Sequence, residues 1–262
     1  MRTLHWRCTT AFLAAGLLLG TASARSEPVP VRFTEGLVHG FLTLSTMDGA
    51  RLANGDLIQT AHGNRVTSQL VFHFTDGSLQ DEHAVFSQQQ QFRFVSYHLV
   101  QKGPAFPRPL EMSIDSSGQA TVQYTDEHGE RKTAIEHIAI PPDLANGLTL
   151  TLMKNVRPEA PPKELSMIVA TPTPRLIKLK LQPPVNETFS LGTGARKAAH
   201  YVLKADIGGL SGLVAPLVGK QPPDSHVWIL EGEAPAFVKS EQPFYMGAPL
   251  WRIELGSPRF AR

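Results

Sequence analysis

The chain has 262 residues, with 25 basic and 23 acidic side chains and a single cysteine. Its 42% hydrophobic and 18% charged residues are typical of a folded globular chain and exclude an intrinsically disordered one. The length allows one large domain or two small ones, and all-β chains of this size are often single domains. The 21 glycines and 21 prolines follow no collagen period, so they indicate many turns.

The first 24 residues have the pattern of a secretory signal peptide. Arg2 and Arg7 supply the positive start, residues 11–20 are apolar, and the A-S-A sequence at 22–24 fits a cleavage site. The apolar stretch is shorter than the ~20 residues that span a bilayer, which disfavours the alternative of a membrane anchor. We therefore predict cleavage after Ala24, a periplasmic or secreted location, and no integral membrane span in the mature chain.

Cleavage would change the chemistry that the chain has available. It would remove two arginines and Cys8, which leaves 23 basic and 23 acidic residues and no cysteine. A chain with no net charge and no basic cluster gives no footprint for a nucleic-acid partner. Disulfides, thiolate nucleophiles and Cys-ligated metals are excluded, and the nine remaining histidines lack ligand spacing. We expect no metal site and no cofactor.

Turn signals and alternating strands follow one another through the mature chain. Asp-Gly and Asn-Gly pairs favour tight hairpins, and they occur at Asp48-Gly49, Asn54-Gly55 and Asp76-Gly77. Between turns, Val66 and Phe72 lie on one face of an expected strand while Arg65 and His73 lie on the other. Further strands are expected at 79–87, 90–101, 119–125, 131–139, 163–170, 174–182, 198–206, 225–231 and 249–255.

One short amphipathic helix is expected around 143–156. Two prolines end the preceding strand, and Asp143 is a good N-cap. Gly147 is expected to weaken the helix by about 1 kcal/mol relative to alanine. The proline-rich run 157–162 is either a loop within one β-rich domain at 25–262, which we favour, or a sub-domain boundary. The helix carries an apolar stripe of Leu144, Leu148, Leu152 and Val156.

Catalytic motifs are incomplete. A glycine pair ending at Lys220 has the wrong spacing for a phosphate loop, and the sequence at 209–213 lacks the second glycine of a nucleophile elbow. Asp81 and His83 share a strand face, so they are the best candidates for a metal pair or for a hydrolase. A solvated polar face is the interpretation that we favour for them.

Residues 207–219 are apolar, glycine-rich and uncharged. They form either a buried plug at the end of a barrel or a lid that touches an apolar ligand. The lid interpretation places Trp228 beneath the loop, and we predict further contacts from strand aromatic residues. The predicted ligand-binding set is Leu210, Leu213, Val214, Leu217, Trp228, Phe72, Phe74, Phe92 and Phe94.

The order of parts resembles a known architecture. A strand meander precedes one short helix and more long strands, and the closing stretch carries Trp228, Glu231, Pro235, Lys239 and Trp251. This pattern resembles an uncharacterised group of exported bacterial β-rich proteins, and is similar to the half-barrel of the periplasmic lipoprotein carriers LolA and LolB. The resemblance implies the fold and, by analogy alone, a carrier role, since fold does not fix function. It brings no catalytic residue, and the absent lipobox departs from LolB-type anchoring.

The sequence therefore predicts an all-β fold, with a large, strongly curved antiparallel sheet that forms an open or incomplete barrel around the helix. If the helix does not fill the concave interior, that interior is an apolar pocket. We favour a non-catalytic exported binding or carrier protein for a lipid, another apolar ligand or a lipidated partner. The alternatives are an envelope scaffold with a filled core and an envelope protein partner, and a hydrolase with Asp or His on strand faces. A cavity larger than a few waters separates the first from the second.

Overall fold

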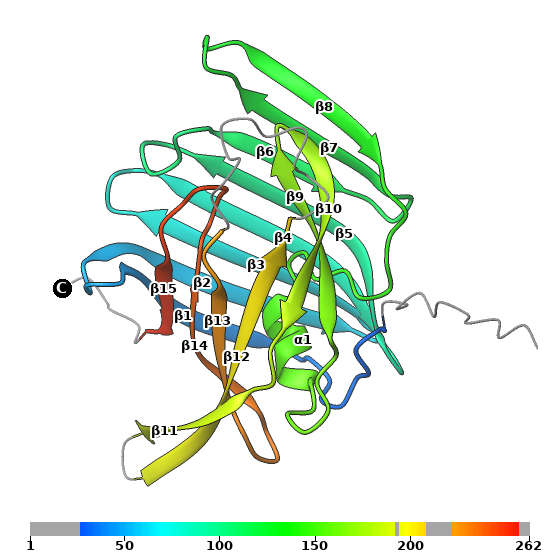
Figure 1. Ribbon diagram of the computed structural model, residues 1–262, viewed down its shortest axis with the longest axis vertical. Coiled ribbons are helices and arrows are strands. Elements are labelled where there is room, and N and C mark those ends of the chain that lie inside the picture. Colours follow the sequence, from blue (N-terminus) through cyan, green and yellow to red (C-terminus); the bar gives the residue numbers. More distant parts are fainter. Residues whose placement is uncertain (1–26, 192–193, 208–221, 257–262) are drawn as a thin grey trace, which may run out of the picture.

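The computed structural model describes residues 27–191, 194–207 and 222–256 (Figure 1). Within these residues the chain forms one antiparallel sheet of fifteen strands and a single short helix, α1 (Thr149–Asn155). The strand path starts at β8 and ends at β9, and these two end strands do not pair. The predicted all-β class and open sheet are confirmed. In the described part of the chain, no helix is long and apolar enough to cross a membrane.

The sheet is a meander that turns back on itself through the chain ends. The strands before α1 pair in sequence order, and the last strand pairs with the first, so the strand order is β8-β7-β6-β5-β4-β3-β2-β1-β15-β14-β13-β12-β10-β9, with β11 on β12. The strands before α1 are β1 (Val38–Thr46), β2 (Arg51–His62), β3 (Arg65–Phe74), β4 (Leu79–Gln88), β5 (Phe92–Lys102), β6 (Leu110–Ile114), β7 (Gln119–Thr125) and β8 (Arg131–His137). Those after it are β9 (Glu164–Thr171), β10 (Thr173–Leu181), β11 (Val185–Leu191), β12 (Gly194–Asp206), β13 (Ser225–Leu230), β14 (Ala236–Gln242) and β15 (Trp251–Leu255).

Most glycine turn signals mark real hairpins, but one does not. Gly49 and Gly77 have φ values of 93° and 85°, the left-handed conformation that favours glycine. The expected turn at Asn54-Gly55 is wrong, because both residues lie inside β2. A Cβ at position 55 would come within 2.4 Å of the Phe72 ring. This glycine therefore makes room for a core aromatic side chain and does not form a turn.

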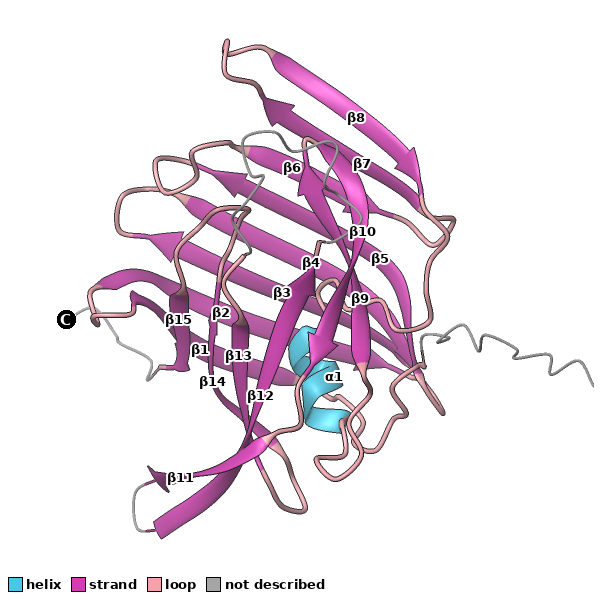
Figure 2. Cartoon of the chain, viewed as in Figure 1, coloured by secondary structure: helices cyan, strands magenta, loops and turns pink. Residues whose placement is uncertain are grey.

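The sheet curls so that its two halves face each other across α1 (Figure 2). One buried cluster joins Phe86 and Ile114 of the first half to Leu203 and Ile229 of the second half, with Leu152 of the helix between them. A second cluster covers the sheet where the first and last strands meet, and it contains Leu42, Leu44, Ala53, Phe72, Phe74, Phe106, Trp251 and Ile253. The helix and these side chains occupy the concave interior.

The helix begins later than the predicted 143–156. Its N-cap is Leu148, with no side-chain cap bond, because Gly147 has a φ of 69° and interrupts the helix. Asp143 does not cap the helix; its Oδ1 instead accepts a hydrogen bond of 2.6 Å from Ser166 Oγ. The expected cost of Gly147 as a helix residue is therefore wrong, because Gly147 is a turn residue. The apolar stripe is buried as expected: Leu144, Leu148, Leu152 and Val156.

Residues 143–146 cover the exposed edge of β9. Leu144 forms a parallel bridge with Ser166, and the Ala145 N–H donates to the Ser166 carbonyl at 2.8 Å. The side chain of Asn146 continues the pairing, because its Oδ1 accepts from the N–H of Ile168 and its Nδ2 donates to the same residue's carbonyl, both at 2.8 Å. Covering an edge in this way satisfies backbone groups that would otherwise attract another strand.

Candidate functional site: a pocket at the end of the helix

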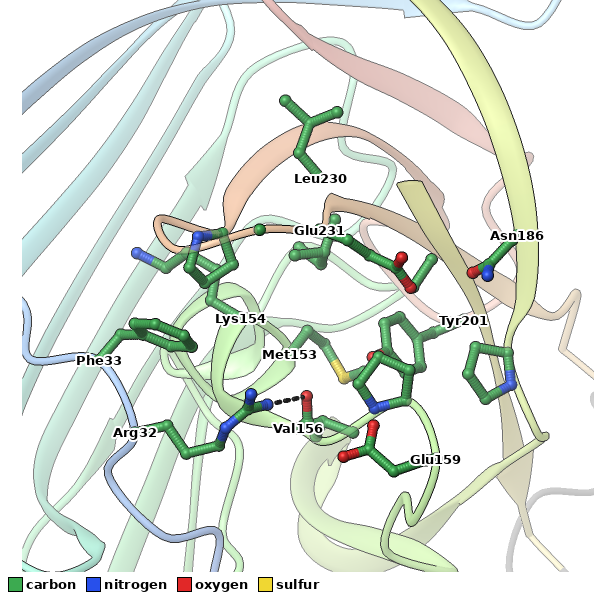
Figure 3. Close-up of a pocket in the computed structure, with 16 residues that line it drawn as sticks. Arg32, Phe33, Met153, Lys154, Val156, Glu159, Asn186, Tyr201, Leu230 and Glu231 are labelled. Carbon is green, nitrogen blue, oxygen red and sulfur yellow. Dashed lines mark hydrogen bonds between the residues drawn. The ribbon is translucent and has the colours of Figure 1, made fainter. Parts of the chain in front are cut away.

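A pocket of about 490 Å³ lies at the C-terminal end of α1 (Figure 3). Its walls come from the segment before β1, from α1 and the loop after it, and from β11, β12 and β13. Apolar lining comes from Phe33, Met153, Val156, Pro158, Ile229 and Leu230. Polar lining comes from Arg32, Lys154, Glu159, Asn186, Tyr201 and Glu231. We call it the helix-end pocket.

Asn155 fastens the N-terminal wall of this pocket to the helix. This buried side chain accepts hydrogen bonds through Oδ1 from the N–H groups of Arg32 at 2.8 Å and Phe33 at 2.7 Å. Arg32 Nη1 donates in turn to the Val156 carbonyl at 3.0 Å, which satisfies a carbonyl at the helix C-terminus. The wall is therefore held by contacts between residues more than 120 positions apart in the sequence.

One of the pocket's charged side chains is already neutralised. Lys154 Nζ lies 2.6 Å from Glu35 Oε1, and Glu35 is itself buried. Gln88 holds Glu35 in place, because its side chain accepts from the Glu35 N–H at 2.7 Å and donates to the Glu35 carbonyl at 2.8 Å. Within the described residues, Arg32, Glu159 and Glu231 have no ion-pair partner.

The hydroxyl group of Tyr201 is influenced by all three of these charged side chains. The Tyr201 side chain lines the pocket and only 1% of the residue is exposed. The pKa of Tyr201 is raised to about 12, mainly by burial and then by the Glu231 and Glu159 carboxylates, while the Arg32 guanidinium opposes the change. All three charges therefore act on one hydroxyl group. That group stays protonated at neutral pH and can donate a hydrogen bond.

The predicted ligand-binding residues that the structure describes do not line this pocket. Phe72 and Phe74 are buried in the second core cluster, Phe92 is buried in the first, and Phe94 packs against the first while partly exposed. The four loop residues Leu210, Leu213, Val214 and Leu217 lie outside the described residues. Their role in binding stays a prediction.

Trp228 belongs to a different cluster, on the outer face of the sheet. Its neighbours Val227 and Ile229 point into the core, so alternation directs Trp228 outward. The His200 ring stacks on the indole at 4.1 Å between centroids, and Lys239 Nζ lies 4.0 Å from the ring centroid. We call Glu187, His200, His226, Trp228 and Lys239 the outer-face cluster.

Glu187 connects the members of the outer-face cluster. Its Oε2 accepts from Trp228 Nε1 at 2.9 Å, and its Oε1 lies 2.8 Å from His200 Nδ1. His200 Nε2 is 2.9 Å from His226 Nδ1. Burial lowers the pKa of His200, Glu187 opposes this change, and His226 lowers it further. Because Trp228 is only 4% exposed, the cluster is a packed polar layer with no open indole surface for a ligand.

Sequence reasoning missed both sites because each depends on contacts between residues that are not neighbours in the sequence. The outer-face cluster depends on strand register, which places Trp228 opposite His200 on one side and Lys239 on the other. The helix-end pocket depends on the contact of Asn155 with residues 32 and 33. The alternation of His226 and Trp228 was the one local signal available for the outer-face cluster, since both residues lie on one strand face.

The side chains suited to hydrolysis gain no support from their positions. Asp81 Oδ1 and His83 Nε2 lie 3.0 Å apart as expected for one strand face, but no third His, Cys, Asp or Glu of the described residues completes a metal-binding group with them. Ser166 Oγ lies 2.9 Å from Lys178 Nζ and donates a hydrogen bond to Asp143. Ser166 is fully buried, however, so no substrate reaches it. Among the described residues, no group of three or more His, Cys, Asp or Glu side chains is placed to hold a metal ion.

Comparison with known proteins gives no relative on which a function can be based. No protein-family model matches the chain, and neither a curated protein nor a solved structure is significantly similar to it. The resemblance to the lipoprotein carriers stays a prediction.

Proposed function

We propose that the protein is an exported, non-catalytic binding protein that holds a small amphipathic ligand in the helix-end pocket. The observation that carries the proposal is the pocket itself. Its volume of about 490 Å³ lies within the range of ~300–1,000 Å³ found for small-molecule sites, and its lining combines apolar surface with a few polar groups. Export is proposed from the signal-peptide pattern of residues 1–24.

The walls of the pocket favour binding because they are already ordered. Strands β12 and β13 supply one wall, and Asn155 holds the opposite one through two hydrogen bonds. A ligand that enters such a site does not have to order the side chains that receive it, which lowers the free-energy cost of binding. Phe33 and Leu230 are partly exposed, so a ligand would bury apolar surface on them.

The alternative of an envelope scaffold is favoured by the filled interior. The helix and the core cluster occupy the space between the sheet halves, where a carrier of the predicted kind would keep its ligand. The two functions differ in one observable property. A binding protein retains a ligand in the helix-end pocket when it is purified from its own host, whereas a scaffold retains none.

Replacing Leu230 with aspartate is expected to abolish ligand retention. The change places a charge on the apolar lining, where it would face the apolar part of the ligand and lose hydration. Because Leu230 is partly exposed at the end of β13, folding is expected to tolerate the change. Native mass spectrometry of the protein from its own host measures the retained mass.

The control is Ile58→Asp, which places the same charge on a side chain that is 42% exposed in β2 and does not line the helix-end pocket. This variant should keep the ligand. A parent protein without any retained ligand would favour the scaffold. Equal retention by both variants would place the ligand elsewhere in the molecule.

A further inference from the structure

We propose that the ligand of the helix-end pocket is zwitterionic, with an ammonium group held by Glu159 and Glu231 and an anionic group held by Arg32. The inference rests on the proposed function and names the chemistry of the ligand. It follows from the charged side chains that line the pocket.

The pocket presents charges of both signs that the described residues leave unpaired. Lys154 is satisfied by Glu35, so the cation that remains is Arg32 and the anions are Glu159 and Glu231. A purely anionic ligand would face two carboxylates, and a purely cationic one would face the guanidinium. A ligand that carries both charges meets an opposite charge at each end. Glu231 is partly buried, so pairing there gains more than pairing at the exposed Arg32 and Glu159.

Arg32 and Glu231 lie on different sides of the pocket. In Figure 3, Arg32 and Phe33 enter from one side, while Glu231 and Asn186 lie on the side of Tyr201. An ammonium group would therefore bind on the Tyr201 side, close to Glu231. Glu159 lies on the loop that follows α1 and contributes the second carboxylate.

Arg32 keeps donors available for an anion. A guanidinium has five N–H donors, and one of those of Arg32 bonds to the Val156 carbonyl. The bond to Val156 restricts the group, and the planar fork of a guanidinium suits two-point recognition of a phosphate or carboxylate. Arg32 therefore has further N–H donors for the anionic part of the ligand.

Two sources supply this chemistry: the headgroup of a zwitterionic lipid, and a free zwitterion without an acyl chain. The apolar lining from Met153 and Leu230 suits an attached chain. Calorimetric titration, below the concentrations at which micelles form, compares four compounds with the same octyl chain. These are octylphosphocholine, octyl phosphate, octyltrimethylammonium and octyl glucoside, and phosphocholine alone tests for the free zwitterion.

Octylphosphocholine is expected to bind at least about tenfold more tightly than the other three octyl compounds. Arg32→Gln should weaken octylphosphocholine and octyl phosphate by about tenfold without weakening octyltrimethylammonium. Glu231→Gln should weaken octylphosphocholine and octyltrimethylammonium without weakening octyl phosphate. Arg131→Gln and Glu127→Gln, two exposed changes outside the pocket, control for net charge.

The outcomes separate this inference from the proposed function. Equal binding of all four octyl compounds would overturn the zwitterion and leave a pocket for amphipathic ligands. Binding of none of them would overturn both. Phosphocholine that binds as tightly as octylphosphocholine would support the zwitterion and identify its source as a free molecule. If Arg32→Gln fails to fold, Glu231→Gln and the four compounds still decide the question.

Discussion

Replacing Gly147 with alanine is expected to lower the free energy of unfolding by about 3–5 kcal/mol. Two costs combine at this position. The residue has a φ of 69°, which an alanine adopts only with strain. A Cβ would also lie 2.4 Å from the Cβ of Ala84 and 3.2 Å from the Tyr97 ring, so the turn before α1 would have to move away from β4. Urea denaturation monitored by circular dichroism measures the loss.

Gly129→Ala separates the two costs. Gly129 has a similar φ of 80°, but a Cβ there would meet no atom within 4 Å. Its replacement should cost only the conformational strain, about 1 kcal/mol. If the two variants lose the same stability, the turn at residue 147 does not pack against the sheet, and the filled interior is wrong.

Replacing Glu82 with glutamine is expected to stabilise the protein by about 2–3 kcal/mol near pH 8. Glu82 points toward the turn before α1, where a Cβ at position 147 would lie 3.4 Å from its Oε1. Burial raises the pKa of Glu82 from 4.5 to about 7. No hydrogen bond or ion pair from the described residues compensates the charge. Because the Glu82 side chain is partly exposed, we expect a smaller stabilisation than the full pKa shift of Glu82 implies.

The sign of the pH dependence follows from the two pKa values. Between pH 4.5 and about 7 the folded chain holds a proton on Glu82 that the unfolded chain has lost. Raising the pH through this window therefore lowers the free energy of unfolding of the parent protein relative to the variant. Below the window the advantage of glutamine disappears. The lowered pKa of His200 acts in the opposite direction, because its burial favours the folded state as the pH rises, so only the difference between variant and parent reports Glu82.

Denaturation curves at several pH values, with the exposed Glu127→Gln as the control for removing one negative charge, measure this difference. A Glu82→Gln variant with the same advantage at every pH would show that the Glu82 carboxylate is hydrated in the folded protein.

Local patterns predicted the strands but not their partners. The alternation of Val66, Phe72 and Phe74 placed β3 well, and the predicted strand at 119–125 has the observed bounds. The strands β1, β2, β6, β11 and β14 were not among the predicted strand ranges. For β2, an Asn-Gly pair suggested a turn where the core needs a residue without a side chain. That need is visible only when Phe72 of the next strand is in place.

The helix and the candidate pocket depended even more on distant contacts. Asp143 looks like an N-cap in the sequence, but β9 offers it Ser166, and the positive φ of Gly147 delays the helix. Asn155 looks like an ordinary helix residue, yet it holds the pocket wall through hydrogen bonds to residues 32 and 33. All the strands of the first half of the sheet lie between these partners in the sequence. Interactions between residues more than a hundred positions apart leave no periodic signal in the sequence.

The best candidate for a ligand site is the helix-end pocket and not the concave interior of the sheet. The interior holds two core clusters and α1, whereas the helix-end pocket has open volume, ordered walls and unpaired charges. The most direct test is an NMR titration of the isotope-labelled protein with octylphosphocholine, read as shifts of backbone amide signals. The account predicts the largest shifts at Phe33, Lys154, Leu230 and Glu231, which line the pocket. Shifts confined to other residues, or no shifts at all, would contradict it.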